Sequence, residues 1–191
     1  MANKYDEIVR YLGGEVAPPA LHTVLSEEEL STIETNLGRR LPSDYREFLC
    51  DYDGISFLKA FVLFPVKSNL DSFHTGHLDG FLSMWSGESN GTQYYHRLVE
   101  KGRTTELRWF QGIRLVREVD TIDEEEGVVW PAELLPIGES PSGSRIALAI
   151  GGLRPGAVFY WIIGDYYGQN VYLVADSFDE FMRSLYREEM F

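Results

Sequence analysis

Three short stretches of the chain carry residue types that could do chemistry. The first, Gly87 to Gly91, spells G-x-S-x-G, the pattern in which a strained strand-to-helix turn presents a serine, here Ser89, as a nucleophile. No apolar strand precedes this stretch and no amphipathic helix follows it, whereas Asn90-Gly91 is a common turn dipeptide. We therefore interpret the stretch as a turn, and we predict no catalytic residue.

The second stretch offers nitrogen and oxygen ligands for a divalent metal. Asp71, His74, His77 and Asp79 lie close together in the sequence, and imidazole and carboxylate groups are frequent metal ligands. Neither a helical pattern nor a nearby cysteine fixes these side chains on one face. We therefore expect surface histidines in a polar loop and no bound metal. The sequence also lacks a Gly-rich phosphate loop and a dinucleotide fingerprint, so we expect no cofactor.

The third stretch is an acidic run that begins at Asp123. Adjacent charges on an extended segment mostly point apart into water, which favours a solvated loop over a metal site. The same carboxylates can instead form an acidic rim for a cationic partner. Two tryptophans from the middle of the chain are candidate anchors, because buried aromatic side chains dominate binding hot spots. The predicted partner-binding residues are Trp85, Trp109, Asp123, Glu124, Glu125 and Glu126.

The composition limits the classes of function. The net charge of -13 over 191 residues repels nucleic-acid phosphates and attracts basic surfaces, so we expect no nucleic acid as a partner. The first twenty residues lack the basic and apolar segments of a signal peptide, and no apolar run is long enough to span a bilayer. The lone cysteine, Cys50, agrees with a reducing compartment. These features predict a cytoplasmic protein without a membrane partner.

The sequence of residues 25–57 predicts two short helices and their caps. Ser26 and Glu29 form the S-x-x-E pattern of a capping box, so a helix is expected to start at Ser26 and to end before Gly38. Pro42 suits the first turn of a second helix, capped by Ser43 or Leu41 and closed by Gly54. An almost continuous apolar segment over residues 57–64 then predicts a strand.

The remaining pattern consists of strands followed by one helix. Residues 112–119 alternate as a half-exposed strand, and residues 170–175 alternate as another strand. Residues 144–150 and 156–162 predict an antiparallel hairpin. Ser177 and Glu180 repeat the capping-box pattern before a final helix. We read residues 68–96 as a long loop with short elements. The fold class is therefore α+β: one domain over residues 1–191, with an antiparallel or mixed, twisted β-sheet flanked by helices and covered on one side.

The helical opening and the closing half of the chain together resemble the SUKH superfamily, which includes bacterial immunity proteins and the yeast regulators of cell-wall synthesis. The closing half contributes ELLPIGES (133–140), SRIALAI (144–150), GAVFYWI (156–162) and VADSFDEFMRSL (174–185). Many members carry Gly-Asp before the strand at 144–150, whereas this chain has Ser144 after Gly143. The matching residues of the opening are Ile33, Leu37, Gly38, Leu41, Pro42, Tyr45, Phe48 and Gly54.

The resemblance implies a SUKH-like domain with a core at residues 25–66 and 131–187 and a divergent insertion at about 67–130. It also implies a function: a non-catalytic, protein-binding immunity protein that neutralises a cognate polymorphic toxin, often a nuclease, by direct contact. A toxin with a basic surface would suit the acidic chain. The alternative is an intracellular regulatory or scaffold protein that binds several partners. The sequence leaves the oligomeric state open.

Overall fold

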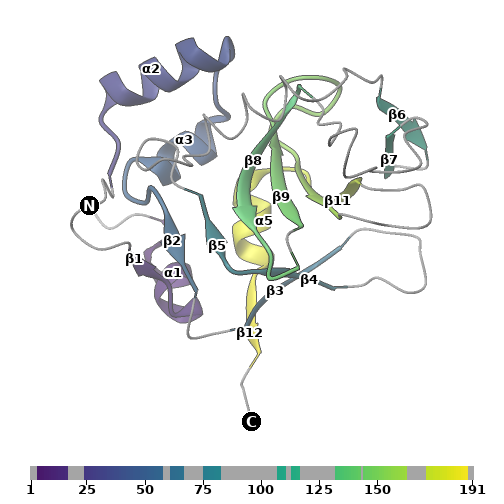
Figure 1. The fold of residues 1–191 in the computed structure, drawn as a ribbon. Coiled ribbons are helices and arrows are strands. Elements are labelled where there is room, and N and C mark those ends of the chain that lie inside the picture. The colour runs from purple at the N-terminus through teal and green to yellow at the C-terminus, as the bar shows by residue number, and fades with distance from the viewer. Residues whose placement is uncertain are drawn as a thin grey trace.

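The computed structural model has four helices and two β-sheets in the part of the chain that it describes (Figure 1). The described residues are 4–16, 24–57, 61–66, 75–82, 107–110, 113–116, 132–142, 144–162 and 171–188. The helices are α1 (Asp6–Leu12), α2 (Glu27–Leu37), α3 (Ser43–Leu49) and α5 (Phe178–Ser184). The helix and strand content confirms the α+β class.

Nine strands form the main sheet, in the order β1-β2-β5-β8-β9-β10-β11-β7-β6, and three form a smaller sheet, β12-β3-β4. The pairings between the described strands are all antiparallel. The strands are β1 (Glu15–Val16), β2 (Ile55–Ser56), β3 (Phe61–Pro65), β4 (Thr75–Leu78), β5 (Gly80–Phe81), β6 (Leu107–Phe110), β7 (Ile113–Val116), β8 (Leu134–Glu139), β9 (Arg145–Ala149), β10 (Val158–Trp161), β11 (Val171–Ala175) and β12 (Tyr186–Glu188).

The centre of the main sheet is buried on both faces, which corrects the expectation of a sheet covered on one side. All five residues of β11 are buried, although their sequence alternates, and β10 is buried throughout. One face joins the main hydrophobic core. The other carries a second cluster that includes Phe159, Trp161 and Leu173. The strand predicted at residues 170–175 is confirmed as β11, which lies between β10 and β7 in the sheet.

An aromatic cluster joins the helices to both sheets. The Phe48 ring on α3 lies with its centroid 5.0 Å from that of Phe178 on α5 and 5.0 Å from that of Phe81 on β5. Phe181, also on α5, contacts Phe64 on β3 at 5.5 Å between centroids. Phe64 in turn meets Tyr160 on β10 at 5.2 Å. Helix α5 therefore packs against the main sheet, the smaller sheet and α3 at once.

The cap at the start of α2 agrees with the prediction, but that of α3 does not. Ser26 Oγ accepts from the Glu29 backbone N–H, and the Glu29 carboxylate accepts from the Ser26 backbone N–H, so both halves of the capping box are present. Pro42, rather than Ser43 or Leu41, is the N-cap of α3. Helix α3 ends at Leu49, well before Gly54, because the chain must turn there to enter β2.

The cap of α5 forms only half of the predicted box. Ser177 Oγ accepts from the Glu180 backbone N–H at 3.0 Å. The Glu180 carboxylate, however, accepts from the backbone N–H of Asp176, one residue before the cap. Only the interaction with Ser177 satisfies a donor that the first turn of the helix leaves unpaired. None of the helices in the described segments combines the length and the apolar character that a membrane span requires.

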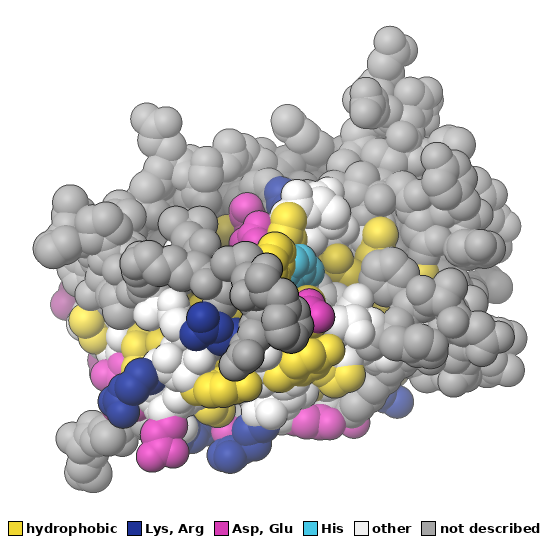
Figure 2. Space-filling view, turned by 90° about the horizontal axis from the view of Figure 1, so that it is seen from below, with side chains coloured by type: hydrophobic (Ala, Val, Ile, Leu, Met, Phe, Trp, Pro, Cys, Tyr) yellow, Lys and Arg dark blue, Asp and Glu magenta, His cyan; other side chains and the backbone are white. Residues whose placement is uncertain are grey.

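The short strands β4 and β5 lie in the stretch that was expected to be a long loop with short elements. Gly80 and Phe81 of β5 pair with β2 on one side and with β8 on the other. This stretch therefore contributes to the interior of the main sheet. Viewed from below, the molecule shows hydrophobic side chains set among acidic and basic ones (Figure 2). Phe61 on β3 and Tyr186 on β12 are exposed hydrophobic residues of the smaller sheet.

Candidate partner-binding site

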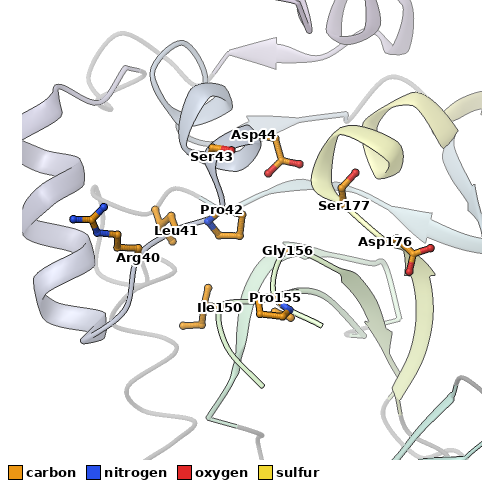
Figure 3. Close-up of a pocket in the computed structure, with 11 residues that line it drawn as sticks. Arg40, Leu41, Pro42, Ser43, Asp44, Ile150, Pro155, Gly156, Asp176 and Ser177 are labelled. Carbon is orange, nitrogen blue, oxygen red and sulfur yellow. The ribbon is translucent and has the colours of Figure 1, made fainter. Parts of the chain in front are cut away.

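Three turns that are far apart in the sequence meet around a surface hollow of about 430 Å³ (Figure 3). We call it the three-turn hollow. One turn joins α2 to α3, the second joins β9 to β10, and the third joins β11 to α5. Its lining residues are Arg40, Leu41, Pro42, Ser43, Asp44, Ala149, Ile150, Pro155, Gly156, Asp176 and Ser177.

Local backbone chemistry fixes the first two turns. Gly38 ends α2 in the left-handed conformation, with φ 64°, and the fixed φ of Pro42 suits the start of α3. Gly156 also has a positive φ, 89°, and its backbone N–H donates to the Ala149 carbonyl at 2.7 Å. A side chain at Gly156 would meet Pro42 Cβ at 3.9 Å. The absence of a side chain here leaves the space between the two turns open.

Asp44 ties α3 to α5 at one end of the hollow. Its Oδ1 accepts from the Tyr45 backbone N–H and its Oδ2 from the Asp179 backbone N–H, each at 2.9 Å. Residues 44 and 179 are distant in the sequence, so this carboxylate bridges two helical N-termini. The Tyr5 hydroxyl donates to the Asp44 carbonyl at 3.4 Å. The carboxylate is thereby held in place by backbone donors rather than by a neighbouring cation.

Asp176 lies on the third turn and is more exposed than Asp44. Its Oδ1 accepts from Arg154 Nη1 at 3.1 Å, and the two side chains are 62% and 41% exposed, respectively. An ion pair this open to water contributes little to stability. Changing Asp176 should therefore alter the charge of the hollow without unfolding the protein.

Burial raises the pKa values of three groups on or beside α1 and α3, none of which lines the hollow. Burial raises the pKa of Tyr5 to about 12, despite the nearby Lys4 ammonium. Burial raises the pKa of Tyr45 well above its usual value, and the charge of Asp53 adds to the shift. Burial also raises the pKa of the Cys50 thiol, which disfavours the reactive thiolate. The described residues contain no group of three or more His, Cys, Asp or Glu that could hold a metal.

The structure places two of the four residues that were weighed as metal ligands, His77 and Asp79. The His77 ring lies on β4 and packs against the Phe61 ring, with 4.9 Å between centroids. Asp79 is exposed beyond the end of β4, and its backbone N–H donates to the Glu139 carbonyl. Asp71 and His74 lie outside the described residues, as does Ser89.

The predicted partner-binding residues are not placed by the structure. Trp85 and the run from Asp123 to Glu126 lie outside the described residues. Trp109 belongs to β6, but only the backbone of that strand is described. The three-turn hollow was missed because its lining residues come from three turns. The sequence did mark each turn separately, through Pro42, the Gly- and Pro-rich hairpin loop, and the Ser177 cap.

Ser144, which stands where many SUKH proteins carry the Asp of Gly-Asp, lies in a network of hydroxyl groups. Ser144 is buried, and its hydroxyl accepts from Ser142 Oγ at 3.1 Å. Ser142 Oγ lies 2.8 Å from Ser140 Oγ, which also accepts from the Tyr160 hydroxyl at 3.4 Å. A chain of hydroxyl groups therefore occupies the β8–β9 turn. Neutral hydroxyls satisfy one another there without the burial of a charge.

Comparison with known proteins identifies the family. The SPbeta prophage-derived uncharacterized protein YokK of Bacillus subtilis (strain 168) is 27% identical over 178 residues, which cover 89% of this chain and 78% of that protein. The SMI1 / KNR4 family (SUKH-1) matches residues 24–184, from just before α2 to the end of α5. This match includes all three turns of the hollow and confirms the resemblance seen in the sequence. The chain belongs to the SMI1 / KNR4 family (SUKH-1).

Proposed function

We propose that this protein is an immunity protein, which binds a toxin encoded beside it and neutralises that toxin by direct contact. The observation that carries the proposal is membership of the SUKH-1 family over residues 24–184. The superfamily includes bacterial immunity proteins that act by binding. On this proposal the protein is not an enzyme, and the hollow serves recognition.

The charge of the chain supports a basic partner. A net charge of -13 creates a long-range attraction for a cationic surface, which speeds association and weakens as salt is added. Nuclease toxins present such a surface, since their clefts must bind phosphates. Neutralisation would then result from occlusion or displacement at that cleft.

Two parts of the molecule are proposed to contact the toxin. One is the three-turn hollow, which combines apolar walls with carboxylates, as protein interfaces do. The other comprises Trp85, Trp109 and the carboxylates from Asp123 to Glu126. Replacing Glu124, Glu125 and Glu126 with lysine should slow association with a basic toxin at low salt. Unchanged association kinetics would remove these carboxylates from the interface.

A regulatory or scaffold protein is the second candidate, because the SUKH superfamily that the sequence resembles also includes the yeast regulators of cell-wall synthesis. The relative from Bacillus subtilis favours the immunity proposal, since its name describes it as prophage-derived, and a mobile element is not a housekeeping locus. The gene neighbourhood separates the two candidates. A toxin gene directly beside this one favours immunity, and an isolated housekeeping locus favours a scaffold.

Coexpression with the product of the neighbouring gene tests the proposal. Cells that express the neighbour alone should stop growing, cells that express both proteins should grow, and the two proteins should copurify. A variant with Phe48→Ala, which should weaken the fold, serves as a control that loses protection. Normal growth with the neighbour alone, or toxicity that this protein fails to relieve, would contradict the proposal.

A further inference from the structure

We propose that the three-turn hollow receives a lysine or arginine side chain of the partner protein. This inference rests on the proposed function, in that it assumes a protein partner. The apolar walls would hold the aliphatic stem of that side chain, and the carboxylates of Asp44 and Asp176 would face its charged end.

The dimensions and walls of the hollow suit one long side chain. Its volume of about 430 Å³ falls within the range of roughly 300–1,000 Å³ that is typical of ligand sites. Leu41, Pro42, Ile150 and Pro155 supply apolar wall. Lysine and arginine side chains commonly lay their methylene stems along such a surface while the charged group stays at a polar end.

The charges in the hollow are unevenly placed. Asp44, Asp176 and Ser177 lie together beside α5, whereas the guanidinium of Arg40 points away from them at the far side (Figure 3). The carboxylate of Glu180 adds a further negative charge beside Asp176, since it accepts from the Asp176 backbone N–H at 2.8 Å. Arg154 pairs with Asp176 but does not line the hollow. The end beside α5 therefore favours a cation.

An anion is a poorer occupant, although two helices begin here. The N-termini of α3 and α5 would attract an anion if their N–H groups were available. Asp44 already accepts from the backbone N–H groups of Tyr45 and Asp179, and Ser177 accepts from that of Glu180. The protein's own oxygens thus occupy these donors. A carboxylate can accept about four hydrogen bonds, so Asp44 retains capacity for a cationic donor.

The charge requirement can be tested without the partner. We would titrate the full-length protein with N-acetyl-arginine amide and follow the backbone amide signals of Ile150, Gly156 and Ser177 by NMR. N-acetyl-norleucine amide, which has an apolar side chain and no charge, is the matched control ligand. Saturable shifts at these amides, with a dissociation constant on the order of a millimolar for the arginine derivative alone, are expected. Equal shifts with both ligands would mean an apolar occupant, and no shifts at these amides would mean an empty hollow; either result overturns the proposal.

A charge reversal tests the role of the hollow in the complex. Asp176→Lys should weaken binding to the neighbouring gene product by about tenfold or more. Glu139→Lys makes the same change of charge on an exposed residue at the opposite end of the β8–β9 ladder, and it should alter the affinity much less. Equal weakening by both variants, or by neither, overturns the hollow proposal while leaving a bound partner and thus the proposed function intact. If the unmodified protein does not bind the product of the neighbouring gene, the proposed function fails. The NMR titration then tests by itself whether the hollow binds a cationic side chain.

Discussion

The aromatic core and the three-turn hollow are built on the same two helices but depend on different forces. In the core, the rings of Phe48 and Phe178 are fully buried and pack against each other. In the hollow, Asp44 and Ser177 sit at the starts of α3 and α5 and are held by backbone hydrogen bonds. Buried apolar area thus fixes the helices, while the proposed recognition site lies at their partly exposed N-termini. Stability and binding should therefore respond to different substitutions.

The largest expected effect is a loss of stability in the core. Phe48→Ala should lower the free energy of unfolding by about 3–5 kcal/mol, because the removed ring leaves a cavity among Tyr5, Phe81 and Phe178. Denaturant unfolding measures the change. Phe61→Ala is the matched control, since Phe61 is 43% exposed and should cost far less. Similar decreases in the free energy of unfolding for the two variants would contradict the assignment of Phe48 to the core and Phe61 to the surface.

A substitution at the hairpin turn should have an intermediate effect. Gly156→Ala would force a side chain into a backbone with φ 89°, and it should reduce the free energy of unfolding by about 1–3 kcal/mol. The added methyl group would also narrow the hollow opposite Pro42. Thermal unfolding and titration with N-acetyl-arginine amide report the two effects separately. An unchanged melting temperature would show that the turn relaxes without strain.

The cap of α2 tests stability at a site away from the aromatic rings. Ser26→Ala removes the acceptor for the Glu29 backbone N–H and should cost about 1 kcal/mol. Ser31→Ala is the control in the same helix, because the Ser31 hydroxyl donates to the Glu27 carbonyl, an interaction that slightly destabilises helices. Chemical denaturation of both variants should separate them. Equal stability would indicate that the start of α2 frays.

The smallest expected effect concerns pH and Asp179 at the junction of core and hollow. The Arg183 guanidinium, with help from Lys4, lowers the pKa of Asp179 below its ordinary value of 3.8. A lowered pKa stabilises the fold above the unfolded-state value, and this contribution disappears as the pH falls through the folded-state value. The effect should be at most about 1 kcal/mol, since both side chains are partly exposed.

A comparison of unfolding at pH 6 and pH 3 should therefore show a smaller change in Asp179→Asn than in the unmodified protein. The difference between the two proteins isolates this carboxylate from the other acids that titrate in the same range. An identical change in both proteins would contradict the assigned ion pair.

The sequence predicted elements whose causes are local. Ser26, Glu29 and Gly38 determine the ends of α2 within a few residues of themselves, and the β9–β10 hairpin follows from its loop. The interior position of β5 and the burial of both faces of β11 depend on strands distant in the sequence. The three-turn hollow could not be predicted from the sequence for the same reason, since Pro42, Gly156 and Ser177 come together only after folding.

The most direct test of the central claim is a calorimetric titration of the purified protein with the product of the neighbouring gene, at low and at high salt. We expect a nanomolar dissociation constant at low salt, about -12 kcal/mol, and weaker binding as salt screens the acidic surface. The absence of binding at low salt, or an affinity that does not change with salt, would contradict recognition of a basic partner by this protein.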